Sequence, residues 1–294
     1  MIQRRIILDS LNVGGLFTLD SGGYLEASKV NTASGSFTIF QSGSTAKTAD
    51  FNNFGELTLK TNCNFEFTNL LVALLSNVSF ESQFGAVIPR ASSVALSGAL
   101  LASRLVVHGT LQIPAFSNVF INIPVYATEL SACKIEVNGQ LTVDSYFSLN
   151  ACDVAGTGKL IISQGLVSDK VVVISVQEIS ISRVFSVSLG SRVHFQNSTI
   201  RLLSCATNIY GSVIAAASSY FILLNDSWMT IQNGSVSGFR MMTCFGATIL
   251  RNSSVEAFEI VFPMQSATVC ETSTISAGIV TTAGILSNCL QHKP

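Results

Sequence analysis

The sequence contains seven cysteines, and four of them form two pairs with the same spacing. Cys133 and Cys152 are 19 residues apart, and Cys270 and Cys289 repeat that step. If one step is one structural repeat, the two cysteines of each pair are stacked neighbours, close enough for a disulfide. Reduced thiols would instead fill the core, because free cysteine is among the most buried residue types. We favour reduced thiols, since no signal peptide places the chain in an oxidising compartment, and a disulfide is the alternative.

Five asparagines stand in the Asn-x-Ser/Thr pattern of N-linked glycan acceptors. They are Asn77, Asn197, Asn225, Asn233 and Asn252. The chain is rich in Asn, Ser and Thr, and chance alone gives roughly four such matches. We treat the five positions as candidate glycosylation sites and infer no type of organism from them.

Acid–base catalysis and calcium binding both need carboxylates that meet on one face. The nearest pair, Glu256 and Glu259, is three residues apart and faces opposite sides of a strand. His108 and His194 are each flanked by apolar residues, which indicates ordinary strand positions. No glycine-rich phosphate loop, Cys-x-x-Cys pair or Ser–His–Asp arrangement can be nominated. We therefore predict no catalytic residue, no metal ligand and no cofactor.

Three phrases near the start indicate the elements that carry these side chains. Residues 15–19, 35–39 and 55–59 each read glycine, any residue, apolar, threonine, apolar, and each begins 20 residues after the last. Apolar–Thr–apolar alternation is typical of a strand with one buried side. A fixed step with β patterning indicates the coils of a β-solenoid.

The step also predicts which side chains stack on one another. With 20 residues per coil, the threonines of the three phrases form an outward column and the preceding apolar residues form an inward one. The outward column is Thr18, Thr38 and Thr58, and the inward column is Phe17, Phe37 and Leu57.

The rest of the chain continues this pattern less regularly. The glycine phrase returns at Gly109, Gly139 and Gly158, and short alternating runs are separated by Ser, Asn, Gly or Thr. Almost no segment has the period of an amphipathic helix. The predicted fold is all-β, a single parallel β-helix of about 20-residue coils, roughly 14 in number. We read residues 1–294 as one domain, and as a fragment of a longer chain because the repeat is already running at Gly15.

Composition limits the possible partners. Only 11% of the residues are charged, the net charge is −1, and no basic run is longer than Arg4-Arg5. Nucleic acid is therefore not an expected partner. The uncharged segment 202–225 is long enough to span a bilayer as a helix, but it contains several polar side chains. An integral membrane protein is kept as a second alternative.

The glycine phrase and the strand rhythm resemble the right-handed parallel β-helix of the pectin-lyase-like superfamily, which surface adhesins and autotransporter passengers share. The resemblance is one of pattern and covers about the first 160 residues. Of the polygalacturonase motifs, only His108-Gly109 is present. The resemblance implies a non-catalytic extracellular or cell-surface β-helix that serves as a stalk, adhesin or scaffold, with a glycan or protein ligand. A polysaccharide-active lyase or hydrolase of the same fold is the first alternative.

Overall fold

The chain folds into a parallel β-solenoid, and its described residues contain strands and no helix. They form about 12 turns with a spacing of roughly 20 residues, which confirms the predicted fold class. The chain divides into two compact units, Met1–Ser145 (unit 1) and Tyr146–Pro294 (unit 2). The structure is a computed structural model, and it describes residues 5–60, 63–72, 78–79, 86–88, 93–96, 100–101, 104–128, 133–224, 226–264 and 266–292.

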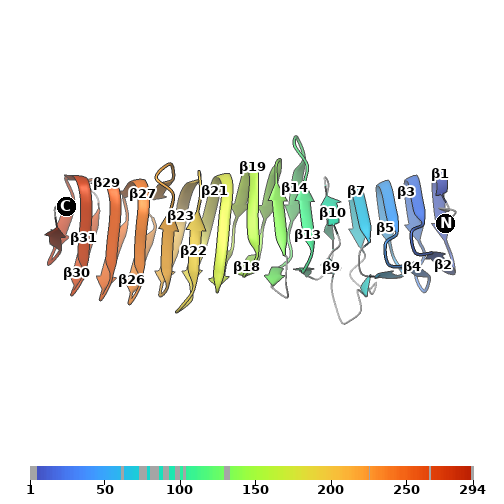
Figure 1. Ribbon diagram of the computed structural model, residues 1–294, viewed down its shortest axis with the longest axis horizontal. Helices are drawn as coiled ribbons and strands as arrows, with labels where there is room; N and C mark the ends of the chain where they lie inside the picture. Colours follow the sequence, from blue (N-terminus) through green and yellow to red (C-terminus); the bar gives the residue numbers. More distant parts are fainter. Residues whose placement is uncertain are drawn as a thin grey trace. The chain divides into compact units, whose positions relative to one another are not determined.

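The first four coils of unit 1 each begin with a nine-residue strand that bends in its middle, and a shorter strand follows (Figure 1). The long strands pair in parallel with one another, and so do the short ones. The strands are β1 (Arg5–Val13), β2 (Leu16–Leu19), β3 (Tyr24–Thr32), β4 (Phe37–Phe40), β5 (Thr45–Asn53), β6 (Glu56–Leu59), β7 (Asn64–Val72) and β8 (Val78–Ser79).

Later coils of unit 1 use shorter strands. Two of them, β10 and β11, pair with the two halves of β7, so each long strand contributes to two walls of the solenoid. We call these the first wall and the second wall. The later strands are β9 (Ala86–Ile88), β10 (Ser93–Leu96), β11 (Leu100–Leu101), β12 (Leu105–Val107), β13 (Thr110–Ile113), β14 (Asn118–Ile121), β15 (Val125–Thr128), β16 (Lys134–Val137) and β17 (Gln140–Val143).

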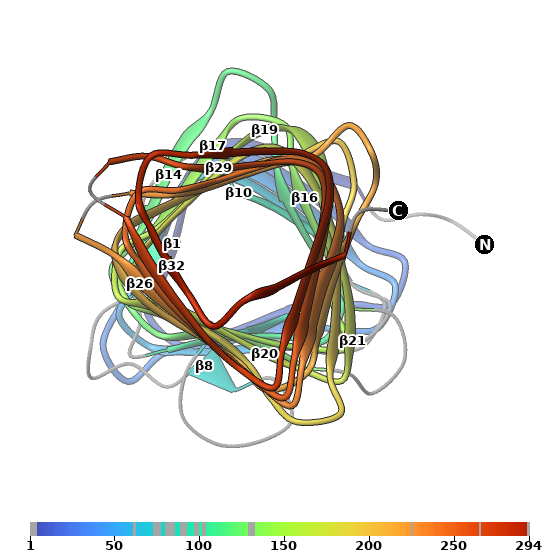
Figure 2. The same ribbon diagram turned by 90° about the vertical axis from the view of Figure 1, so that its left-hand side faces the viewer.

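Unit 2 has the same three-walled coil (Figure 2). Its strands also pair in parallel. One wall contains β18, β20, β26, β28, β30 and β32 together with the last parts of β21 and β23. The strands are β18 (Tyr146–Asn150), β19 (Asp153–Ile162), β20 (Gly165–Asp169), β21 (Val171–Val187), β22 (Arg192–Phe195), β23 (Thr199–Ile209), β24 (Ser212–Ala215), β25 (Tyr220–Leu223), β26 (Trp228–Gln232), β27 (Ser235–Cys244), β28 (Ala247–Arg251), β29 (Ser254–Phe262), β30 (Ala267–Glu271), β31 (Thr274–Thr282), β32 (Ile285–Ser287) and β33 (Leu290–His292).

The core of unit 2 contains a chain of aromatic rings that come from different walls. Phe185 packs on Phe195, and Phe195 on Phe239, with ring centroids 6.3 Å apart in both pairs. Phe221 lies 5.4 Å from Phe239 in a T-shaped arrangement. All four side chains are buried. Such pairs stabilise a core beyond the burial of their area, and here they tie the walls together.

The 20-residue step is an average, and one predicted column is wrong because of this. Phe17 pairs with Thr38, and Thr38 pairs with Leu57, so the steps are 21 and then 19 residues. Thr38 is buried, whereas Phe37 is 48% exposed. Since side chains alternate along a strand, a shift of one residue moves each of them to the other side. The predicted outward column is therefore wrong at Thr38, and the predicted inward column is wrong at Phe37.

The shift arises at one corner. Two residues connect β1 to β2 and β5 to β6, but four residues connect β3 to β4. Because of the longer corner, β4 begins one residue later than an even 20-residue step would place it. Ile39 therefore takes the outward place between Thr18 and Thr58. Thr38 Oγ1 has no hydrogen-bond partner within the described part of the chain, so the shift places an unsatisfied hydroxyl in the core.

Candidate functional site

A groove of about 360 Å³ lies along the corner where the first and second walls of unit 1 meet. The corner is open because the residues at the bends of β3 and β5, Ser28 and Ala49, are small and exposed. Four ionisable side chains line the groove: Asp9, Glu26, Lys47 and Glu66. Three carboxylates and one ammonium give the lining a net charge of −2.

Three of these side chains form a ladder across consecutive strands. Glu26 lies opposite Lys47, and Lys47 lies opposite Glu66. Neighbouring strands are about 4.8 Å apart, so negative, positive and negative groups follow one another at that spacing. Lys47 Nζ is 3.2 Å from Glu66 Oε2, and this hydrogen bond raises the pKa of Lys47 above its ordinary value.

Glu26 is held at the other end of the ladder. Arg5 Nη2 lies 3.4 Å from Glu26 Oε2, and the Tyr24 hydroxyl donates a hydrogen bond of 3.0 Å to the same oxygen. The Arg5 guanidinium also lies 4.9 Å from the centre of the Tyr24 ring, in cation–π contact. Exposed ion pairs add little to stability. The strand register sets the order of the charges at the edge of the groove, and these contacts place Glu26 beside Arg5 and Tyr24.

The second wall of the same coils carries a ladder of amides. Asn31 Nδ2 donates to Asn12 Oδ1 at 2.8 Å, and Asn52 Nδ2 donates to Asn31 Oδ1 at 2.9 Å. An amide has two donor hydrogens and a carbonyl oxygen with two lone pairs. Each ladder bond uses one donor hydrogen of one amide and one lone pair of the next amide's carbonyl oxygen. The row therefore has donors and acceptors left for a ligand.

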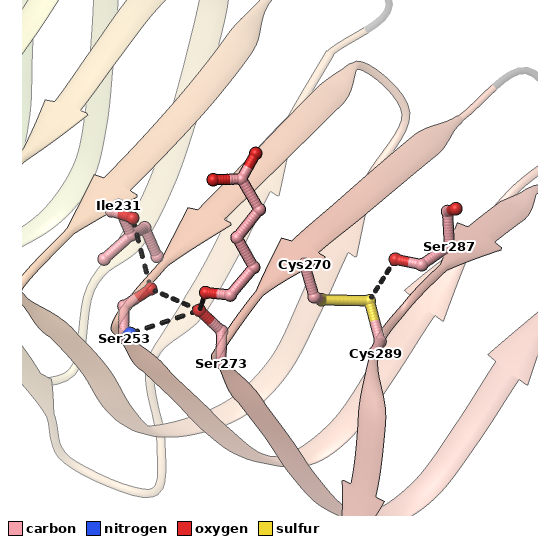
Figure 3. The surroundings of a disulfide bond; sticks show 7 residues. Ile231, Ser253, Cys270, Ser273, Ser287 and Cys289 are labelled. Carbon is pink, nitrogen blue, oxygen red and sulfur yellow. Dashed lines mark hydrogen bonds between the residues drawn. A yellow bond between two sulfur atoms is a disulfide. The ribbon is translucent and has the colours of Figure 1, made fainter.

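Cys270 and Cys289 are joined by a disulfide, with their Cα atoms 4.9 Å apart (Figure 3). The favoured prediction of reduced thiols is wrong for this pair, whereas the predicted proximity is confirmed, because the two Cα atoms lie within the span of a disulfide. Cys133 and Cys152 are buried and are disulfide-bonded as well. Cys133 belongs to unit 1 and Cys152 to unit 2, and their stacking on one another stays a prediction.

The other three cysteines, Cys63, Cys205 and Cys244, are free and buried. Burial raises the pKa of Cys63, that of Cys205 to about 11 and that of Cys244 to about 12. The thiolate is the reactive form of cysteine. These three thiols therefore belong to the core and are not candidate nucleophiles.

Three of the five sequon asparagines lie at corners of unit 2. Asn197, Asn233 and Asn252 are exposed and have φ values of 53°, 53° and 45°. Asparagine tolerates this left-handed conformation better than most residues do. A buried serine follows Asn197 and Asn252, so corner geometry accounts for part of the sequon pattern. Asn77 and Asn225 lie outside the described residues, and glycosylation stays a prediction at all five positions.

The carboxylates and histidines considered first do not line the groove of unit 1. The prediction that Glu256 and Glu259 face opposite sides of a strand is wrong, because the alternation along β29 restarts at exposed Phe258 and both carboxylates project outward. His108 lies at the corner between β12 and β13, so the predicted strand position is wrong for it, and its Nδ1 is 3.2 Å from the Thr128 hydroxyl. His194 lies in β22, as predicted.

Within the described ranges, no three His, Cys, Asp or Glu side chains are placed to hold a metal ion. The sequence did not predict the groove because Glu26, Lys47 and Glu66 are separated by 21 and 19 residues, not by the expected 20.

Comparison of this chain with protein-family models, with curated proteins and with solved structures gives no match. The uncharged segment that could have formed a spanning helix contributes to β23, β24 and β25 instead. In the part of the chain that the structure describes, no helix has the length and apolar character to cross a bilayer.

Proposed function

We propose that this chain is a non-catalytic β-helix that acts outside the cell or at its surface as a scaffold for ligand binding, of the stalk or adhesin type. The observation that carries the proposal is the charged ladder beside the groove of unit 1, in which Glu26, Lys47 and Glu66 keep a fixed order and spacing. Solenoids use extended surfaces of this kind for binding. The resemblance to pectin-lyase-like adhesins supports the same role.

The disulfides support the proposed compartment. Cys270 and Cys289 are bonded, and Cys133 and Cys152 are oxidised too. Disulfides persist outside the cell and are rare in the cytosol.

The groove favours a neutral or amine-bearing glycan. Carboxylates accept hydrogen bonds from sugar hydroxyls and attract ammonium groups. The lining charge of −2 repels a uronic-acid polymer. The amide ladder on the second wall supplies further donors and acceptors for hydroxyl groups.

The test is a binding panel of neutral, amine-bearing and acidic polysaccharides on the immobilised chain. We expect neutral or amine-bearing polymers to bind, and Glu26→Gln with Glu66→Gln to weaken that binding about tenfold or more. Glu256→Gln in unit 2 is the matched control and should leave binding unchanged. Preference for polygalacturonate, or full binding by the double variant, would contradict the proposal.

A polysaccharide-active lyase or hydrolase is the second candidate, because the groove contains three carboxylates and glycosidases work with pairs of them. The same polymers can be incubated with the chain and examined for new reducing ends or unsaturated products. Cleavage that Asp9→Asn abolishes would favour the enzyme. Binding without cleavage would favour the scaffold.

A further inference from the structure

A second groove, of about 380 Å³, lies at a corner of unit 2. Its walls are apolar, formed by Leu203, Leu224 and Phe245, and Ser204 and Asp226 supply its polar groups. Asp226 is exposed, and within the described residues it makes no hydrogen bond or ion pair. Among the residues that the structure describes, the groove therefore presents one carboxylate without a partner beside apolar surface.

Trp228, the only tryptophan of the chain, stands next to this carboxylate. Asp226 and Trp228 are exposed, and Ser227 between them is buried, so both side chains point outward. Trp228 is 52% exposed and lies between Ala206 and Ala247 on the neighbouring strands. The small alanines leave the indole accessible.

Ser227, between Asp226 and Trp228, is held by several hydrogen bonds. Ser227 Oγ accepts a hydrogen bond from the Cys205 amide at 3.0 Å and donates one to the Leu202 carbonyl at 3.0 Å. The Ser227 amide donates to the Leu224 carbonyl at 2.9 Å. The next coil approaches so closely that a Cβ on Gly246 would lie 1.8 Å from the Ser227 carbonyl oxygen. The Ser227 backbone beside Trp228 is thus fixed by these contacts, which lowers the entropy cost of binding.

A row of apolar side chains runs along the wall from Trp228. Trp228, Ala247, Ala267 and Ile285 lie opposite one another on β26, β28, β30 and β32. Ile285 is 68% exposed. Contiguous apolar surface of this kind marks interaction sites, and tryptophan is enriched among the residues that dominate binding energy.

We propose that this corner docks a protein partner through an arginine side chain flanked by apolar residues. The charge complement of Asp226 is a cation, and apolar walls suit the methylene stem of arginine. The guanidinium pairs with the carboxylate and stacks on the Trp228 indole. The flanking apolar residues of the partner cover the alanine and isoleucine surface. This site is independent of the groove in unit 1.

The test uses the emission of Trp228 as the reporter. The probe is acetyl-Leu-Arg-Leu-amide, and its control has citrulline, a neutral isostere, in place of arginine. We expect a saturable change in emission with the arginine peptide and an affinity for the citrulline peptide that is about fivefold lower or weaker still. Asp226→Asn should reduce arginine binding to the citrulline level and leave citrulline binding unchanged. Glu256→Gln, an exposed carboxylate elsewhere in unit 2, should change neither.

Several outcomes would overturn the proposal. They are equal affinity for the two peptides, full arginine binding by Asp226→Asn, and the absence of a saturable response. A change in Trp228 emission on dilution without peptide would make a second copy of the chain the occupant. A response to neutral oligosaccharides but not to the arginine peptide would make the site a sugar platform. Circular dichroism of each variant verifies that unit 2 remains folded.

Discussion

At the scale of single residues, buried serines supply hydrogen-bond partners to backbone groups at the corners. Strand ladders break where the chain turns, and the backbone groups left there must find partners. Ser198 Oγ donates to the Gln196 carbonyl, Ser219 Oγ accepts from the Ser198 amide, and Ser273 Oγ accepts from the Ser253 amide. A hydroxyl is small enough to be buried in a corner and can both donate and accept. These serines therefore contribute to stability out of proportion to their size.

Replacement of one such serine tests this role. In the wild-type chain the Ser253 amide donates a hydrogen bond of 3.1 Å to the Ser273 hydroxyl. Ser273→Ala removes this acceptor and leaves the buried amide without a partner. We expect the free energy of unfolding of unit 2 to fall by about 1–3 kcal/mol. The measurement is urea unfolding followed by circular dichroism. Ser254→Ala is the control, because Ser254 is exposed, and an equal loss in both variants would argue against the corner bonds.

At the scale of the elements, the corners set which side of a strand faces the core. The four-residue corner before β4 shifts its register by one position relative to an even 20-residue step, and this places Thr38 inside and Phe37 outside. The steps of 21 and 19 residues cancel over two coils, so the first and third glycine phrases occupy equivalent positions and the second is displaced by one residue. The regular spacing of the glycine phrases in the sequence therefore does not reveal that the steps between paired strand residues are 21 and 19.

The register leads to opposite expectations for two similar substitutions. Leu57→Asp buries a carboxylate without a partner, since Leu57 is 2% exposed, and should cost several kcal/mol. Phe37→Asp places its charge in solvent, since Phe37 is 48% exposed, and should cost less than about 1 kcal/mol. Hydrogen exchange should show lost protection in β4, β6 and their neighbours for Leu57→Asp alone, because each coil is stabilised by the adjacent ones. Equal damage by both would contradict the register.

The last described coil depends on its disulfide. β32 pairs with β30 at three positions and β33 with β31 at three, whereas β29 and β31 pair at eight. The disulfide between Cys270 and Cys289 closes a loop of 19 residues. Closing such a loop stabilises the fold by about 3 kcal/mol in the chain-entropy model. Cys270→Ser with Cys289→Ser should therefore release β32 and β33, seen as fast amide exchange in 283–292. Cys63→Ala, a free cysteine in unit 1, is the control. Unchanged protection in the double serine variant would show that strand pairing alone holds the coil.

At the scale of the whole molecule, the fold class could be predicted from the sequence and the candidate site could not. Strand alternation and a recurring step are local signals, and they are repeated often enough to survive irregular corners. The ladder of Glu26, Lys47 and Glu66 is different, because an even step of 20 places Ala46 beside Glu26 and turns Lys47 to the other side. Asp226 and the apolar groove beside it depend in the same way on corners whose lengths vary. Register is a property of the folded coils, and a single residue of error reverses every side chain.

The buried thiols make the stability of the whole chain sensitive to alkali. Burial raises the pKa of Cys205 to about 11 and that of Cys244 to about 12. In the unfolded chain both thiols ionise at about pH 8.5–9, so the folded state retains protons that the unfolded state releases. Their contribution to stability is complete below that pH and is lost as the pH rises toward the folded values. Between about pH 8 and pH 10.5 we expect each thiol to cost about 2 kcal/mol.

Comparison with Cys205→Ala/Cys244→Ala isolates this cost. The variant has cavities and a lower free energy of unfolding at pH 8, so the quantity to compare is the change in that free energy from about pH 8 to about pH 10.5. Lysine and tyrosine side chains titrate in both proteins and cancel in the comparison. The wild-type chain should lose several kcal/mol more than the variant over this range, measured by urea unfolding at each pH. An equal loss in both proteins would mean that the two thiols are exposed to solvent before they ionise. That result would contradict their burial in the core.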